Sequence, residues 1–414
     1  MTVDELHRAR QEYDALVARG LELDLTRGKP SPRQLDLANA MLEQPVGAVS
    51  AAGVDLRNYG GLEGLPELRA IFADALQVPV DQLLAAGNSS LELMHDAVVF
   101  ALLGVVPGAE RRWADVEGLT FLCPVPGYDR HFGICERFGI RMIPVPMTPE
   151  GPDLDVVERL VAGDPAIKGM WCVPKYSNPD GTVYSDETVR RLAAMETAAP
   201  DFRIFWDNAY AVHHLTDTET GIAGLLALAA GHGHPDRVFV FGSSSKITFA
   251  GAGVAFFGSS PANLEWWLSH TVKRSIGPDK LNQLRHVQFL RDADGLRTHM
   301  RNLADLIRPK FEAVDKILSA ELGGTGLASW TSPAGGYFIT LQVPPGCARA
   351  VVAKAKEAGI ALTPAGASHP YGDDPDDRVI RIAPTFPELP EVEAAISAVA
   401  TCVRLVAAEK AVAG

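Results

Sequence analysis

A lysine flanked by serines stands between two apolar runs in the stretch FVFGSSSKITFAGAGVAFF, residues 239–257. Lys246 follows the run RVFVF and precedes a Gly-Ala-Gly turn that opens onto the second run. A lysine between buried strands is costly unless its amine is neutralised or used covalently. A Schiff base is one covalent use, and it requires small polar neighbours for the group that the lysine carries. An exposed loop lysine is the simpler alternative.

Other polar residues follow other apolar runs. Asp207 ends the run FRIFWD, and a carboxylate there needs a cationic partner such as a protonated ring nitrogen. Tyr210, and Asn178 in PKYSNPDG, can each donate to an oxygen on the same ring, and Tyr128 after LTFLCPVPG can stack on its face. Taken singly, Asp207 is also typical of a helix cap, Asn178 of a turn, and the two tyrosines of a hydrophobic core. Together with Lys246 they indicate a ring-shaped cofactor.

A polar turn, GNSS, leads directly into an apolar helical pattern at residues 84–104. The free N–H groups at such a helix start form an anion site suited to a phosphate, with the hydroxyls of Ser89 and Ser90 beside them. Simple N-capping by Asn88 or Ser89 is the alternative. The turn therefore predicts either a phosphate site or a helix cap.

Short apolar runs alternate with helical patterns through the middle of the chain, which favours an α/β fold with a mostly parallel sheet and helices on both sides. Helices are predicted for residues 2–19, from Pro66, and at 154–161 and 187–196. Strands are predicted at 119–128, 140–147, 168–174, 202–207, 237–243 and 253–258. Ligands bind at the carboxyl ends of strands in such sheets, where the polar residues above fall.

The pattern changes to long helices from residue 279 to residue 318, with Pro309 expected to bend or restart them. Beyond Gly323 strands and helices alternate again, at 336–343, 348–358, 378–382 and from Glu388. This predicts a smaller α+β domain at 296–414, completed by an N-terminal segment at 1–50, beside a large domain at 51–295.

The composition is 47% hydrophobic and 21% charged, with a net charge of −13. This charge argues against non-specific binding to nucleic acid or anionic membranes. The five cysteines are odd in number and contain no CxxC pair, so they predict neither a disulfide framework nor a zinc site. His213-His214 and GHGH at 231–234 lack a ligand set, so no metal is expected. The N-terminus has no signal-peptide pattern and no long apolar run appears, so we expect a cytoplasmic protein.

The motifs RNYGGLEGLPELR, GNSS, PGY, YSNPDG, DNAY, SSSK and VIRIAP occur in this order over nearly the whole chain. This order resembles the class I aminotransferases of fold type I, which depend on pyridoxal 5'-phosphate, and among them an atypical bacterial aspartate aminotransferase subgroup. The resemblance implies a large domain with a seven-stranded sheet, a smaller domain and a homodimer with shared active sites.

The resemblance also implies roles for single residues. Lys246 would bind the cofactor covalently and carry protons, and Asp207 would hold the proton on the ring nitrogen. Arg381, in VIRIAP, would bind the substrate α-carboxylate with its planar fork, near a mobile segment at Gly28. The remaining cofactor contacts implied are Tyr128 on the ring, Tyr210 and Asn178 at its oxygen, Asn88, Ser89, Ser90 and Ser243 at the phosphate, and Tyr59 reaching the phosphate of a neighbouring subunit.

The chain departs from the family at one position. The family usually has an arginine eight residues after the lysine, bonding the phosphate, and Val254 stands there. The phosphate must then depend on the GNSS helix start and on hydroxyls of Ser243, Ser245 or Thr248. No motif identifies the cation for the substrate side-chain carboxylate, and the candidates are Arg27, Lys29, Lys175, Lys273 and Arg274.

The resulting prediction is a transaminase that moves the α-amino group of L-aspartate to 2-oxoglutarate. The aspartate part depends on the subgroup resemblance alone. The alternatives are a transaminase for aromatic, 2-aminoadipate-like or alanine substrates, a lyase on the same scaffold and, from another class, the effector domain of a winged-helix regulator. The regulator would need a basic DNA-binding module, which the acidic balance of this chain disfavours.

Overall fold

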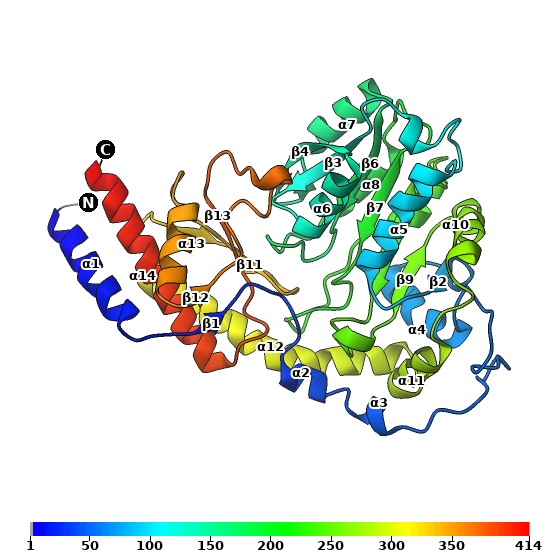
Figure 1. The fold of residues 1–414 in the computed structure, drawn as a ribbon, viewed down its shortest axis with the longest axis horizontal. Helices are drawn as coiled ribbons and strands as arrows, with labels where there is room; N and C mark the ends of the chain where they lie inside the picture. The colour runs from blue at the N-terminus through cyan, green and yellow to red at the C-terminus, as the bar shows by residue number, and fades with distance from the viewer. Residues whose placement is uncertain (1–2, 414) are drawn as a thin grey trace.

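The structure, a computed structural model, describes residues 3–413 and has two lobes (Figure 1). The larger lobe holds a central sheet covered by helices, and the smaller lobe holds short strands beside two helices at opposite ends of the chain. The helix α12 (Ala293–Leu322) runs along the lower side of Figure 1 and packs against elements of both lobes. Within residues 3–413 no helix is both long and apolar enough to cross a membrane.

The central sheet has the strand order β2-β9-β8-β7-β6-β3-β4-β5. Its strands are β2 (Leu83–Ala85), β3 (Thr120–Val125), β4 (Arg141–Thr148), β5 (Gly151–Pro152), β6 (Ile167–Cys172), β7 (Arg203–Asp207), β8 (Val238–Ser243) and β9 (Ala255–Gly258). The strands from β8 to β4 run parallel, whereas β9 is antiparallel to both of its neighbours and β5 is antiparallel to β4. The six predicted strands and the mostly parallel sheet are confirmed. The sheet has eight strands where seven were expected, and β5 adds only two residues.

Alternate residues of the central strands pack in two different hydrophobic clusters, because successive side chains of a strand point to opposite faces. In β8, Val238 and Val240 pack with one layer of helices, and Phe239 and Phe241 pack with another. The first layer contains α4 (Pro66–Leu76), α7 (Leu154–Gly163), α8 (Asp186–Ala194), α9 (Leu225–Gly231) and α11 (Lys280–Leu290). The second contains α5 (Ser90–Leu103), α6 (Asp129–Phe138) and α10 (Pro261–Arg274). The sheet is therefore covered on both faces.

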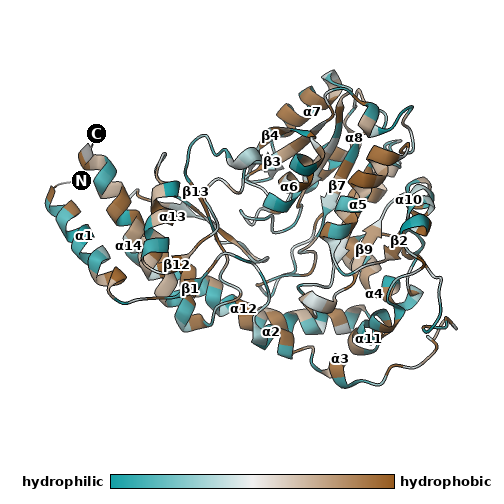
Figure 2. Ribbon diagram, in the orientation of Figure 1, coloured by the Kyte–Doolittle hydropathy of each residue, from teal (hydrophilic) through white to brown (hydrophobic). Residues whose placement is uncertain are grey.

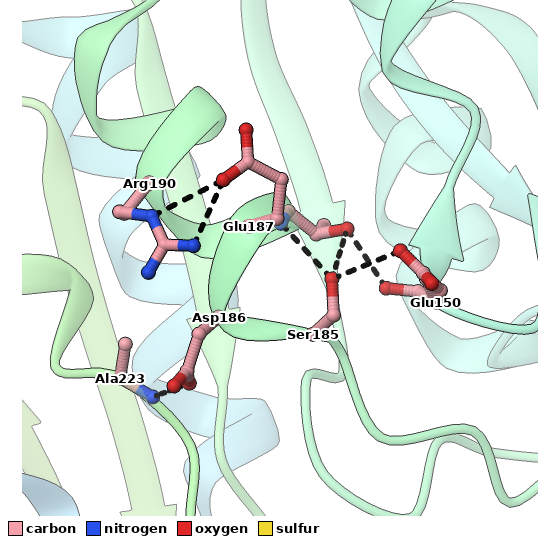
Figure 3. A network of polar contacts seen from close by, with 7 residues as sticks. Glu150, Ser185, Asp186, Glu187, Arg190 and Ala223 are labelled. Atoms are coloured by element: carbon pink, nitrogen blue, oxygen red, sulfur yellow. Dashed lines mark hydrogen bonds and ion pairs between the residues drawn. The ribbon is translucent and has the colours of Figure 1, made fainter.

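The start of α8 is fixed to two other segments of the large lobe (Figure 3). Ser185 caps the helix by accepting the Thr188 N–H at 3.1 Å, and the Thr188 hydroxyl donates to the Glu150 carbonyl at 2.9 Å. On the other side Asp186 accepts the Ala223 N–H at 2.9 Å. These bonds fix the start of α8 against both segments.

The smaller lobe joins the two ends of the chain. The strand β1 (Leu23–Asp24) pairs in parallel with β12 (Ile360–Ala361), and β10 (Ser329–Trp330), β11 (Ile339–Gln342) and β13 (Val379–Ile382) form an antiparallel sheet. The helix α1 (Val3–Val17) packs against α14 (Leu389–Ala413). The remaining helices are α2 (Pro32–Asp36), α3 (Ala40–Glu43) and α13 (Ala348–Glu357). Thr2, the predicted first residue of the first helix, lies outside the described residues.

The expected effect of Pro309 is wrong in one respect, because α12 continues through it as one helix. The chain restarts earlier, where Arg291 has a φ of 67° and Asp292 caps α12 by accepting the Gly295 N–H at 2.8 Å. Polar and apolar residues alternate along α12 (Figure 2), and Ile307 and Phe311 are buried on either side of the proline. Burial of this face stabilises the helix although Pro309 removes one backbone hydrogen bond.

Candidate active site

A cavity of about 540 Å³ lies where the carboxyl ends of β6, β7 and β8 meet the smaller lobe. Its wall includes every predicted site residue except Asn88 and Tyr59. These residues are Gly28, Ser89, Ser90, Tyr128, Asn178, Asp207, Tyr210, Ser243, Lys246 and Arg381. Residues that lie far apart in the sequence are therefore gathered around one space.

Lys246 lies half-buried just beyond β8, and its amine is 5.0 Å from the centre of the Tyr210 ring. Burial lowers the pKa of Lys246, and the charge of Asp207 opposes this shift. The Lys246 carbonyl accepts hydrogen bonds from His213 Nε2 and from the Tyr337 hydroxyl, both at 3.3 Å. The backbone is thus fixed on both sides, and a lowered pKa favours the neutral, nucleophilic amine.

Asp207 ends β7 with one carboxylate oxygen paired and the other unpaired. His131 Nε2 donates to Oδ2 at 3.0 Å, and both side chains are at most 4% exposed. Oδ1 is buried without a hydrogen-bond partner. A buried carboxylate oxygen without a partner is costly, so this atom suits a ligand that presents a proton.

His131 was not identified from the sequence. It comes three residues after Tyr128 in PGYDRH, one helical turn into α6, and its ring stacks on Trp171 at 4.5 Å between centroids. The spacing places Tyr128 and His131 on the same side of the helix start, and that is the one signal in the sequence for this contact.

Of the three ring-contacting residues predicted from the sequence, Tyr210 and Asn178 are buried and Tyr128 is half-buried. Burial raises the pKa of Tyr128 and of Tyr210, so both phenols keep their protons and can act as donors. Asn178 is 3% exposed and accepts a hydrogen bond from Arg381 through Oδ1, which leaves its amide N–H groups for another acceptor.

The start of α5 forms the opposite end of the cavity. The helix begins at Ser90, and Ser89 is its N-cap residue but makes no side-chain capping bond. The Ser245 hydroxyl donates to the Asn88 carbonyl at 3.1 Å, so Asn88 lies next to the cavity wall without being part of it. Unpaired N–H groups at a helix start, with hydroxyls around them, are suited to a phosphate.

Val254 and Thr248 both form hydrogen bonds within the core and do not line the cavity. Val254 is 2% exposed in the core, and its N–H donates to Ser244 Oγ at 2.9 Å. The Thr248 hydroxyl is buried 2.8 Å from His286 Nε2, so Thr248 is not available and that alternative is wrong. Ser243 and Ser245 remain as hydroxyls on the cavity wall.

Arg381 comes from β13 of the smaller lobe and is largely buried. It donates to Asp129 Oδ1 at 2.9 Å and twice to Thr363 Oγ1, and its guanidinium lies 5.1 Å from the Phe338 ring centre. Gly28 approaches the same ring so closely that a Cβ there would lie 2.4 Å from Phe338 Cζ.

The cavity wall holds three further cations, Arg27, Lys29 and Arg130. Arg130 was not among the sequence candidates, although it follows Tyr128 by two residues. The other candidates lie away from this wall. Lys175 donates to the Ala211 carbonyl at 2.8 Å, Lys273 to the Ser269 carbonyl, and Arg274 pairs with Glu92 and Asp96.

This donor set fits pyridoxal phosphate. The unpaired Asp207 Oδ1 matches a protonated ring nitrogen, the Lys246 amine with its lowered pKa matches a carbonyl carbon, and the Ser89–Ser90 helix start matches a phosphate. In the part of the chain that the structure describes, no group of three or more His, Cys, Asp or Glu side chains could hold a metal ion.

Comparison with known proteins gives one family. Residues 1–414 match the family described as Aspartate amino-transferase. An aspartate aminotransferase of Corynebacterium glutamicum is 50% identical over 402 residues, covering 97% of this chain and 93% of that protein. A crystal structure of an aspartate transaminase from the same species has a TM-score of 0.96 at 49% identity, covering 98% of this chain and 96% of the other. An α-aminoadipate aminotransferase of Thermus thermophilus shares the fold, with a TM-score of 0.75 at 22% identity over 97% of this chain and 98% of the other.

Proposed function

We propose that this chain, which belongs to the aspartate aminotransferase family and is an aminotransferase, takes the α-amino group of L-aspartate and gives it to 2-oxoglutarate. The observation that carries the dicarboxylic part is the charge of the cavity wall. Arg381 alone would serve one carboxylate, and Arg27, Lys29 and Arg130 add three cations to the same wall. An aromatic or alanine substrate has no second carboxylate to offset them.

The cofactor would be held by residues of this wall. Asp207 would face the ring nitrogen, Tyr210 and Asn178 the ring oxygen, and Tyr128 the ring face. Asn88, Ser89, Ser90 and Ser243 would hold the phosphate. When bound, pyridoxal phosphate supplies an electron sink that makes the substrate α-hydrogen acidic.

Lys246 would then transfer protons, and Arg381 would bind the substrate. The Lys246 amine, with its pKa lowered by burial, would act as the general base that takes the proton from the substrate α-carbon. It would then act as the general acid that donates this proton to a different atom. Arg381 would fix the α-carboxylate, and the Gly28 segment would lie over the substrate. Closure of the cavity between the two lobes would exclude water from the reacting atoms.

We further propose a homodimer. Tyr59 is 80% exposed and Ile276 on the adjoining loop is 63% exposed, and the Gly60 N–H donates to the Ile276 carbonyl at 3.0 Å. The Lys280 amine donates to the carbonyls of Asn58 and Gly60 and so holds the Tyr59 loop in place. An ordered, exposed aromatic residue suits contact with a second copy, in which Tyr59 would reach the partner's phosphate site. Residues 51–295 would form the large domain, and 1–50 with 296–414 the small one.

Reduction of the purified holoenzyme with borohydride, followed by peptide mass spectrometry, tests the cofactor site. A phosphopyridoxyl mass on the peptide that contains Lys246 is expected. A label on Lys175, a buried lysine that does not line the cavity, would refute the assignment.

A panel of amino donors tests the substrate. We expect kcat/KM to be highest for L-aspartate with 2-oxoglutarate. A higher kcat/KM for an aromatic amino acid, L-alanine or 2-aminoadipate would replace aspartate as the proposed donor.

A further inference from the structure

The guanidinium of Arg381 is almost fully engaged by the protein itself. Nη1 donates to Asp129 Oδ1 at 2.9 Å and to Asn178 Oδ1 at 3.4 Å. Nη2 and Nε both donate to Thr363 Oγ1, at 3.2 and 3.3 Å. A guanidinium has five N–H groups, so four bonds leave only one N–H, on Nη2, without a partner.

A bidentate carboxylate needs two parallel N–H groups, either from Nη1 and Nη2 or from Nε and Nη2. Both Nη1 N–H groups and the Nε N–H are occupied, so a substrate carboxylate binds in this way only if Asp129, Asn178 or Thr363 gives up a bond. One of the three must therefore act as the exchangeable partner.

Burial and further bonds identify Asp129 as that partner. Asn178 is 3% exposed. Thr363 is 6% exposed, and its hydroxyl donates to the Thr26 carbonyl at 2.9 Å. The Asp129 side chain is 31% exposed at the first residue of α6, on the cavity wall, and Arg381 is its one hydrogen-bond partner within residues 3–413. It can turn towards water without leaving a buried polar group unpaired.

We propose that Asp129 is a built-in competitor for the substrate α-carboxylate. It occupies the Arg381 fork in the free enzyme and is displaced when a substrate carboxylate binds. The inference depends on the proposed role of Arg381. Asp129 lowers the affinity for every carboxylate ligand, because each must break the same charge-assisted bond before it can form its own.

Calorimetric titration of the holoenzyme with succinate tests this competition. Succinate has two carboxylates and no amino group, so it binds without reacting. Asp129→Asn removes the competing charge, and we expect the succinate Kd to fall about tenfold, the scale of one charge-assisted bond. Asp129→Ala should shift the Kd in the same direction, and it replaces the Asn variant if that protein does not fold.

Glu136→Gln is the matched control, because Glu136 is exposed on the same helix and does not line the cavity. Its succinate Kd should equal that of the wild type. Unchanged or weaker succinate binding in both Asp129 variants would overturn the inference and would make Asp129 a residue that orients Arg381 instead.

Arg381→Gln separates this inference from the proposed function. If Arg381 binds carboxylates, this variant should lose nearly all affinity for succinate, and adding Asp129→Asn to it should restore none. If Arg381→Gln binds succinate as the wild type does, the proposed role of Arg381 fails, and the competition fails with it. If Arg381→Gln loses affinity while the Asp129 variants gain none, only the competition is refuted.

Discussion

His131 and Asp207 form a buried pair in which the imidazole Nε2 donates to carboxylate Oδ2 at 3.0 Å. The pair comes from a helix start and a strand end that are 76 residues apart. One oxygen is thereby fixed by the protein, and the other, Oδ1, is buried without a hydrogen-bond partner and would be free for the proposed cofactor. His131 is a positioning residue in this arrangement, since it acts through Asp207.

His131→Phe should therefore weaken cofactor binding while the fold is kept. The phenyl ring can still stack on Trp171, which the His131 ring contacts at 4.5 Å, but it cannot donate to Asp207. We expect the pyridoxal phosphate Kd to rise and kcat to fall, each about tenfold, the scale of one hydrogen bond to a charged group. Fluorescence titration of the apoenzyme and steady-state kinetics measure the two effects.

His131→Gln is the control for this prediction, because the Gln amide Nε2 can donate from nearly the same place. It should recover much of the loss and shift the visible absorption of the holoenzyme less than His131→Phe does. Equal binding and turnover in the Phe variant and the wild type would show that the pair has no role in catalysis.

Charge removal on the cavity wall should identify the cation that binds the substrate side chain. Arg27→Gln, Lys29→Met and Arg130→Gln each remove one cation from the wall. In the variant that lacks the relevant cation, kcat/KM for L-aspartate should fall about a hundredfold and that for L-alanine should stay nearly constant. Lys29 lies 3.8 Å from the Phe386 ring centre, so its substitution also removes a packing contact.

Lys273→Met serves as the control, since Lys273 lies on α10 away from the cavity wall. Suppose that none of the three wall variants changes the ratio of aspartate to alanine turnover. The distal carboxylate would then be bound by a group that this chain alone does not place in the cavity.

β7 and β8 were predictable because each is a run of apolar residues that ends in a polar one. β7 ends at Asp207 and β8 at Ser243, as the runs FRIFWD and RVFVFGS indicate. β2 and β5 were missed because runs of three and two residues are too short to show a period.

The contacts within the site were not predictable in the same way. The Arg381–Asp129 bond joins residues 252 positions apart, and no local pattern encodes such a pairing. The predicted restart at Pro309 was wrong because the sequence shows the hydrogen bond that a proline removes but not the burial that compensates for it. Lys175 and Arg274 remained candidates for the same reason, since a sequence does not show which cations already have partners.

The stability of the protein should fall as the pH is lowered, in part because of His213. Burial is the main cause that lowers the pKa of His213 to about 3, and Lys246 adds to it. The unfolded chain binds this proton near pH 6.5, so it holds more protons than the folded chain between about pH 6.5 and 3. Stability is therefore lost as the pH falls through this window, by about 1.4 kcal/mol per pH unit.

His213→Gln isolates this contribution, because the amide does not titrate and can still donate to the Lys246 carbonyl. The unfolding free energy of the wild type, relative to that of the variant, should fall by about 2 kcal/mol from pH 7 to pH 5, measured by urea denaturation. Asp180, whose pKa burial raises to about 6, works in the opposite direction, but it is present in both proteins and cancels. A difference that does not change with pH would contradict the prediction.

Gly28→Ala should impair substrate binding more than cofactor binding. A Cβ at this position would lie 2.4 Å from Cζ and 2.8 Å from Cε1 of Phe338, so the segment or the ring must move. The ring lies beside Arg381, and the segment carries Arg27 and Lys29 on the cavity wall. We expect KM for L-aspartate to rise about tenfold, because a small displacement of charged groups weakens bidentate binding.

Two further variants make this prediction specific. Gly47→Ala places a methyl group in the same N-terminal segment where the nearest atom is 3.8 Å away, and its KM should match the wild type. Phe338→Leu removes the ring atoms that the new methyl group would meet, so the double variant should recover part of the affinity that Gly28→Ala loses. A wild-type KM in Gly28→Ala would mean that the segment yields freely and that its close approach to Phe338 does not position the substrate cations.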